Sequence, residues 1–365
     1  MRVLIAMPSL RRGGAERHSV YLATALTAAG HQVDVVALSD GPFSQDLSEA
    51  GIPVTVLEVG CGARALPTVT RRLSQVVDRL NPDVISAHDV NVEMALRGVL
   101  LRRWRPAIVW KHTYGHIGHR GARERLVEAA SGHLVAAYGA VCHTQVRYLC
   151  QALGLPSRKI HVLPNTVPTA PEASWPVDEP LTVAMVAAMR ADKGHDDALR
   201  AWSGVVRRHP EATLVLAGDG PARDEILGQI SRLGLTRNVR VLGEVAEPLQ
   251  VVARSHALLL ASYNIECFPY VALEAMSVGR GVISTSVGGL PEMVDDRVTG
   301  MLAPPRHPDA LRDAILQAVE GNGLRDLGAA GRERLVHCFP MAAWNARAVQ
   351  LIETVAGATR GGGAE

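Results

Sequence analysis

Short apolar runs, each followed by a loop and then by a stretch at helical spacing, recur along nearly the whole chain, and they constrain its fold more than any other feature. The first run is Arg2 to Met7, which ends at Pro8 and precedes a helical stretch from Ala15 to Ala29. Further β-rich runs lie at 33–38, 54–59, 83–88, 107–112 and 136–144. Alternating strands and helices of this kind predict a parallel sheet covered by helices on both faces.

A proline-rich segment then interrupts the pattern. Residues 169–180 contain Pro171, Pro176 and Pro180, which no regular element would accommodate. Beyond this segment the pattern restarts, with predicted strands at 181–189, 212–220, 238–245, 256–262 and 281–289. The chain therefore reads as an α/β protein with two Rossmann-like parallel domains, which we expect to face each other across a cleft.

The expected organisation assigns every part of the chain. We predict an N-terminal Rossmann-like domain at 1–168, a linker at 169–180 and a C-terminal Rossmann-like domain at 181–340. An amphipathic helix at 341–356 is expected to pack back toward the N-terminal domain, and 357–365 reads as a flexible tail. Ligands of open parallel sheets bind outside the carboxyl ends of the strands, so functional residues are expected there.

Composition excludes several classes of protein. The 365 residues exceed the size at which a single core keeps growing, which favours two domains. A formal net charge of +2 argues against a protein that holds duplex nucleic acid. Five scattered cysteines without a C-x-x-C pair suggest neither a zinc site nor a redox dithiol, and the short N-terminal apolar run is no signal peptide. We therefore expect a cytoplasmic protein.

The first candidate site residues are Gly13 and Gly14, in the sequence GGAER after the first predicted strand. Glycines at the entry to a helix let the backbone approach a phosphate or a sugar closely. The run matches neither a P-loop nor a G-x-G-x-x-G dinucleotide motif. A tight strand-to-helix turn without any ligand explains it equally well.

A second candidate is the cation pair Arg190 and Lys193, in MRADKGH directly after a predicted strand. Two cations three residues apart at the mouth of a sheet suit a diphosphate, because Arg binds two oxygens and Lys supplies a point charge. The alternative is a pair of solvated surface cations.

The third and most specific pattern is ECFPYVALEAMSVG at 266–279, in which seven residues separate Glu266 from Glu274. Pro269 is expected in the first helical turn, where the amides of Tyr270 and Val271 would face an anion. Glu274 has apolar neighbours in this helix and requires a partner, such as a hydroxylated ligand. A salt bridge to an arginine is the alternative.

Histidines cluster at 111–119, where the sequence reads KHTYGHIGH. His112 is placed at the predicted end of a strand and could reach the cleft. The spacing of His112, His116 and His119 resembles a zinc site only superficially, because no acidic or cysteine ligand completes the set. We predict no metal site.

In this order the motifs resemble those of the retaining GT-B glycosyltransferases of the GT4 family, over nearly the whole chain. The resemblance is strongest in the second half, at Arg190–Lys193–Gly194, LVLAGDGP at 214–221, the Glu266/Glu274 pair, EAMSVGRGVISTSVGGLPEMV at 274–294 and TGMLAPP at 299–305. GGAER, SAHD at 86–89, His112 and VLPNTVP at 162–168 fit more loosely. Two departures, Thr166 where the family has glycine and HTQ at 143–145, affect the acceptor half and the hinge.

The resemblance implies that the domain at 1–168 is the acceptor side and that the domain at 181–340 binds the nucleotide sugar. It also implies a role for each candidate residue. Arg190 and Lys193 would bind the donor diphosphate, and Glu274 would bind the ribose hydroxyls. Glu266, with the amides after Phe268, would hold the donor sugar. Gly13 and Gly14 would approach the donor from the opposite wall, and His112 would contact the transferred sugar; with Glu266, Arg190 and Lys193 it forms the expected catalytic set. The family uses no divalent metal and no cofactor beyond the nucleotide sugar.

Donor and acceptor stay open at this point. A UDP-sugar such as UDP-GlcNAc is favoured as donor and GDP-mannose comes second, with a small molecule or glycan as acceptor. Arginine clusters at 102–105 and 120–125 could instead contact an anionic membrane and a lipid-linked acceptor, although a solvated face explains them better. An epimerase or phosphorylase of the same fold, a non-catalytic sugar-nucleotide-binding protein and an NAD-dependent oxidoreductase are the remaining alternatives.

Overall fold

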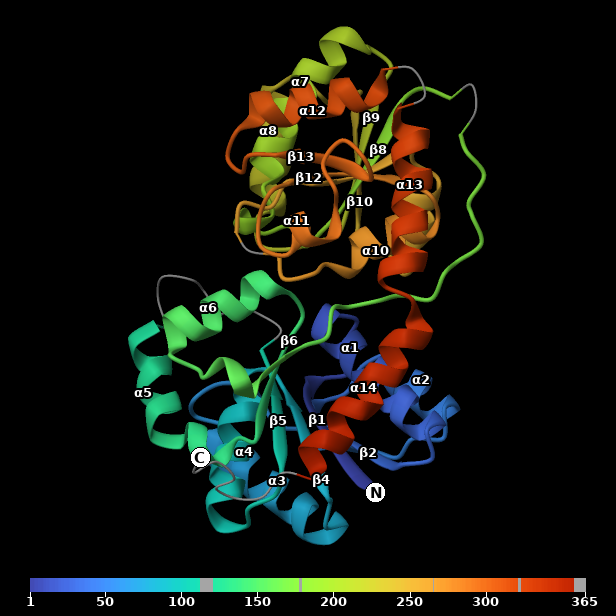
Figure 1. Cartoon of the computed structure of the whole chain (residues 1–365). Helices are drawn as coiled ribbons and strands as arrows, with labels where there is room; N and C mark the ends of the chain where they lie inside the picture. Colours follow the sequence, from blue (N-terminus) through green and yellow to red (C-terminus); the bar gives the residue numbers. More distant parts are fainter. Residues whose placement is uncertain (112–120, 177–178, 265, 321–322, 358–365) are drawn as a thin grey trace. The chain divides into compact units, whose positions relative to one another are not determined.

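The computed structural model describes residues 1–111, 121–176, 179–264, 266–320 and 323–357. The chain divides into two compact units: Met1–Pro164 with Ala342–Glu365, and Asn165–Met341. We call these the first unit and the second unit. Each has its own hydrophobic core. The predicted class is confirmed, because each unit contains one parallel sheet with helices packed on it (Figure 1).

The first unit is built on a seven-stranded sheet of order β3-β2-β1-β4-β5-β6-β7. Its strands are β1 Arg2–Ser9, β2 Gln32–Ser39, β3 Val54–Val56, β4 Val84–His88, β5 Ala107–Trp110, β6 Ala137–Ala140 and β7 Ile160–Val162. Its helices are α1 Gly14–Ala28, α2 Phe43–Glu49, α3 Leu66–Leu80, α4 Val90–Arg102, α5 Gly121–Ser131, η1 Gly132–Leu134, α6 His143–Leu153, η2 Ser157–Lys159 and the C-terminal α14 Met341–Ala356. An edge-to-face ring contact between Trp344 of α14 and His18 of α1 belongs to this unit.

The second unit is built on a six-stranded sheet of order β10-β9-β8-β11-β12-β13. Its strands are β8 Thr182–Val186, β9 Thr213–Ala217, β10 Val239–Gly243, β11 Ala257–Leu260, β12 Gly281–Thr285 and β13 Gly300–Ala303. Its helices are η3 Ala191–Lys193, α7 His195–Arg208, α8 Arg223–Arg232, α9 Pro248–Ala253, α10 Tyr270–Ser277, α11 Leu290–Met293, α12 Pro308–Val319 and α13 Gly323–Cys338. Helix α7 packs against α8 and α12, whereas α10 packs against α9 and α13.

The proline-rich segment is packed onto the second unit rather than left as a free linker. Arg280, which is buried, donates from all three of its guanidinium nitrogens to backbone carbonyls of Ala173, Ser174, Ala253, Ser255 and Val278. Its guanidinium also lies over the ring of Trp175, 5.2 Å from the centroid. A buried guanidinium requires acceptors for its N–H groups, and the irregular segment supplies two of them.

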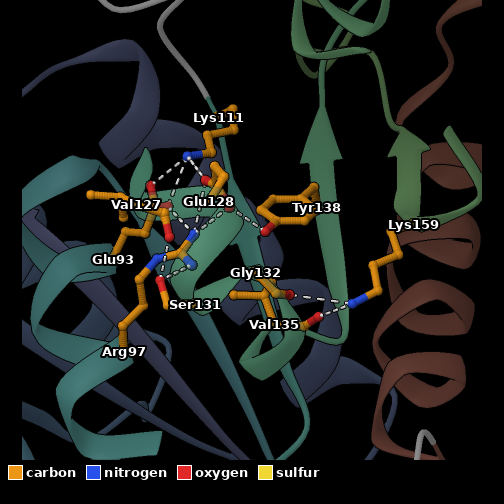
Figure 2. Close-up of polar contacts among 10 residues, drawn as sticks. All are labelled: Glu93, Arg97, Lys111, Val127, Glu128, Ser131, Gly132, Val135, Tyr138 and Lys159. Atoms are coloured by element: carbon orange, nitrogen blue, oxygen red, sulfur yellow. Dashed lines mark hydrogen bonds and ion pairs between the residues drawn. The ribbon is translucent and has the colours of Figure 1, made fainter. Parts of the chain in front are cut away.

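A buried group of charges ties four elements of the first unit together (Figure 2). Arg97 Nη2 lies 2.7 Å from Glu93 Oε1 and 2.8 Å from Glu128 Oε2. Lys111 Nζ lies 2.8 Å from Glu93 Oε1 and 3.0 Å from Glu128 Oε1, and the hydroxyl of Tyr138 donates to Glu128 at 2.5 Å. We call Glu93, Arg97, Lys111 and Glu128 the buried quartet. Because its two cations face two carboxylates, its formal charge is zero.

Candidate functional site

Polar side chains gather at the carboxyl ends of β8 and β11 in the second unit, where an open parallel sheet binds its ligands. Two loops carry them: the Lys193 loop at 187–194 and the Glu266 loop at 261–269, of which residue 265 is not described. Gly194, with φ of 70°, holds the two loops close together, because a Cβ there would lie 1.9 Å from the carbonyl oxygen of Ala261. No side chain larger than glycine would fit.

The structure brings Lys193 and Glu266 into direct contact. Lys193 Nζ lies 2.5 Å from Glu266 Oε1, and the hydroxyl of Ser262 donates to the same oxygen at 2.6 Å. The backbone carbonyl of Glu266 accepts a hydrogen bond from the amide of Gly289, after β12. Groups that follow β8 and β11 therefore hold the Glu266 carboxylate, and a group that follows β12 holds its backbone. Lys193 can exchange this carboxylate for an incoming anion.

Arg190 is placed differently from Lys193. Its guanidinium forms a bidentate pair with Asp192, with distances of 2.9 Å from Nε and 2.6 Å from Nη2. The hydrogen bonds that Arg190 donates to Asp192 raise the pKa of Arg190, and the same bonds hold the pKa of the Asp192 carboxyl below its usual range. The Arg190 side chain is 53% exposed, so it can turn toward a ligand in solvent at the cost of this pair.

The helix that carries the second glutamate begins one residue later than expected. Pro269 is the N-cap of α10, with ψ of 130°, so it precedes the helix instead of occupying its first turn. Tyr270 and Val271 open α10, and the first turn of an α-helix has amides without partners inside the helix. Phe268 is buried, whereas Glu274 lies one turn into α10 with its side chain half-buried.

The remaining candidates belong to the first unit. Gly13 is the N-cap of α1 and Gly14 its first residue, which confirms the predicted strand, loop and helix. A Cβ on Gly13 would lie 2.3 Å from the carboxylate of Glu16, which accepts a hydrogen bond from Ser9 at 2.8 Å. His112 lies outside the described residues, as do His116 and His119. Among the residues that are described, no group of three or more His, Cys, Asp or Glu side chains could hold a metal ion.

The arginines at 102–105 are partly engaged in the fold. Arg103 contacts Asp78 and Asn81 at 2.9 and 2.7 Å, and Arg105 also reaches Asn81 at 2.7 Å. These bonds secure the end of α3, where Asn81 has a φ of 47°. In the described part of the chain, no helix has the length and apolar character that crossing a membrane requires.

Sequence reasoning missed four contributors to this region: Ser262, Asp192, Asn165 and Gly289. Ser262 follows β11 directly, so its place after a buried strand was a usable signal. The amide of Asn165 donates to the carbonyl of Phe268 at 2.7 Å, across 103 positions of sequence. No local pattern could have indicated that contact.

Comparisons with known proteins agree with this architecture. The family described as "Glycosyl transferases group 1" matches residues 169–334, and "Glycosyltransferase Family 4" matches residues 12–170. A glycogen synthase of Mycobacterium tuberculosis is 27% identical over 99% of this chain and 96% of its own length. A D-inositol 3-phosphate glycosyltransferase of Segniliparus rotundus is 31% identical over 66% of this chain and 56% of its own length.

Among solved structures, Anabaena HepE in complex with UDP-glucose superimposes with a TM-score of 0.85, at 21% identity and over 97% of this chain and 100% of that one. This likeness shows that the folds agree, with two Rossmann-like units in the GT-B arrangement of elements. The two family matches together run from residue 12 to residue 334. The chain is a glycosyltransferase that belongs to family 4, the glycosyl transferases group 1.

Proposed function

We propose that the chain transfers a sugar, with retention of its anomeric configuration, from a nucleotide-diphosphate sugar to a hydroxyl acceptor. UDP is the favoured nucleotide and UDP-GlcNAc the favoured donor. The observation that carries the proposal is the contact between Lys193 and Glu266 at 2.5 Å, beside the first turn of α10. The UDP-glucose in HepE, a protein of the same fold, supports a UDP-linked donor.

The paired charges suggest how a donor would enter. Lys193 and Arg190 face Glu266 and Asp192, so these four groups have no net charge before a diphosphate arrives. We expect the diphosphate to take both cations, because phosphate oxygens compete well for Arg and Lys and can also accept from the first-turn amides of α10. Glu266 is then released to accept hydrogen bonds from sugar hydroxyls, and Glu274 binds the ribose.

The transfer step follows from these contacts. The bond from the anomeric carbon to the phosphate oxygen breaks, and a bond to the acceptor oxygen forms on the same face. The acceptor proton moves to the departing phosphate oxygen, so UDP leaves and no other reactant is consumed. The cations stabilise the charge that develops on the leaving diphosphate, which is the main electrostatic demand of the step.

Calorimetry with UDP tests the donor site. Replacing either cation, as Lys193→Met or Arg190→Met, should weaken UDP binding about tenfold or more, because each removes charge-assisted hydrogen bonds. Arg312→Met is the matched control, since Arg312 of α12 pairs with Asp309 and Asp313 instead. Wild-type affinity in both site variants would contradict the assignment.

A donor panel tests the reaction itself. The pure wild-type protein is incubated with UDP-GlcNAc, UDP-glucose and GDP-mannose, and release of the free nucleotide is followed. Slow hydrolysis of a UDP-sugar is the expected result, because water can replace the acceptor at the anomeric carbon. Binding of UDP without turnover of any donor would instead favour a sugar-nucleotide-binding protein.

A further inference from the structure

We infer that Asn165 is a positioning residue for the donor-sugar subsite. This inference rests on the donor site proposed above. Asn165 is the first residue of the second unit, where the chain arrives from the first unit. Its side chain is buried, and its Nδ2 donates to the backbone carbonyl of Phe268 at 2.7 Å. That carbonyl stands between Glu266 and the helix start at Tyr270. Asn165 therefore holds the turn that presents both groups.

A second hydrogen bond lies beside this anchor but does not involve the Phe268 carbonyl. The chain leaves the second unit just after Met341, and the hydroxyl of Thr166 donates at 2.5 Å to the carbonyl of Phe339 in this exit segment. The ring of Phe339 packs against the ring of Phe268, with centroids 5.2 Å apart and planes at 75°. The entry and the exit of the chain are thus bonded to each other, and both touch Phe268.

The fixed carbonyl matters because it lies between Glu266 and the first turn of α10. Glu266 is held by Ser262 and Gly289, whereas Phe268 carries the turn into the N-cap Pro269, which has no N–H to donate and no side-chain cap. Without Asn165, a buried carbonyl would lose its side-chain donor, and the turn would relax to find another. The sugar contacts of Glu266 would become less precise. The nucleotide contacts of Arg190 and Lys193, which lie on the other loop, and of Glu274, one turn into α10, would change less.

This difference gives the test. We compare the dissociation constants of UDP and of UDP-GlcNAc, or of UDP-glucose where the wild-type protein hydrolyses that donor instead. In Asn165→Leu, a variant of similar volume, the ratio of the UDP-sugar constant to the UDP constant should rise about tenfold, because a buried donor is lost. The UDP constant alone should change less than about twofold. Asn165→Ala should behave in the same way.

Thr166→Val is the matched control, because it removes the neighbouring buried hydrogen bond without touching Phe268. Its ratio should stay at the wild-type value. An unchanged ratio in both Asn165 variants overturns the inference, as does an equal rise in Thr166→Val. An Asn165 variant that does not fold, or that loses UDP affinity to the same extent, assigns Asn165 to general stability and also overturns it. Failure of the wild-type protein to bind UDP would contradict the proposed function instead.

Discussion

His195 is a buried histidine directly after the Lys193 loop, at the first position of α7. Burial, and to a smaller extent the nearby Lys193, lower its pKa to about 4, so the ring is neutral at neutral pH. Its Nδ1 atom is buried without a hydrogen-bond partner. In the unfolded chain the same ring has a pKa of about 6.5. Folding is therefore coupled to proton release below neutral pH.

We expect the free energy of unfolding to fall as the pH is lowered from about 6.5 toward about 4, by up to about 1.4 kcal/mol per pH unit, because the unfolded chain binds a proton that the folded chain excludes. His195→Gln should remove this part of the slope. Urea unfolding at several pH values measures it. His337→Gln, in an exposed position on α13, should leave the slope unchanged. Equal slopes in the wild-type protein and His195→Gln would show that another group is responsible.

At the residue scale, the sequence predicted which charged side chains follow which strands, but it did not predict their partners. Lys193 and Glu266 were both singled out, and their direct contact emerges from the adjacency of β8 and β11. Asp192 was not singled out, although its carboxylate pairs with Arg190. Arg190 must leave this ion pair before it can bind a ligand. Asn165 was noticed only as part of a motif. The roles of Gly13, Gly14 and His112 stay predictions.

At the scale of elements, the buried quartet joins α4, the end of β5 and α5, and Tyr138 adds β6. Burial lowers the pKa of Lys111, but Glu93 and Glu128 beside it outweigh burial and leave the pKa raised. Burial and the carboxylate of Glu128 both raise the pKa of Tyr138, so its hydroxyl stays protonated and donates. Each charged side chain of the quartet therefore depends on the others to offset the free-energy cost of burying its charge.

Lys111→Met should destabilise the chain by about 3–5 kcal/mol, because it leaves the two buried carboxylates of the quartet with one of its two cations, Arg97. Arg103→Met is the matched control: it removes a cation from an exposed pair with Asp78 and should cost about 0–1 kcal/mol. Chemical denaturation of both variants provides the comparison. Similar small losses in the two variants would show that the quartet is relaxed or hydrated in solution.

The regular elements were largely predictable because buried parallel strands are continuous apolar runs. Strands such as β4, β5, β11 and β12, which are buried along their whole length, lie inside predicted runs. The strands that were not identified, β7 and β13, each lie at one edge of their sheet and have only three and four residues. A short edge strand gains its conformation from a neighbour distant in sequence. Its own residues carry little signal.

At the scale of the whole molecule, the second unit contains the proposed nucleotide-binding groups by itself. Lys193, Glu266 and Glu274 all lie within Asn165–Met341, together with the anchor Asn165. The formal net charge of the chain is only +2, so long-range attraction contributes little to capture of an anionic donor. Binding must come from the local exchange of Asp192 and Glu266 for phosphate oxygens.

This local exchange predicts catalysis without a divalent metal. In many sugar transfers a metal ion neutralises the leaving diphosphate; here Arg190 and Lys193 supply two positive charges, and the first turn of α10 adds oriented amides. We expect an excess of EDTA to change turnover of the UDP-sugar by no more than about twofold, since the compensating charge belongs to the protein. A control with Lys193→Met separates the two sources: if a metal carried the charge, this variant would keep its turnover and lose it only in EDTA. Loss of wild-type activity in EDTA, with recovery on adding Mn²⁺ or Zn²⁺, would contradict the prediction and direct attention to His112, His116 and His119.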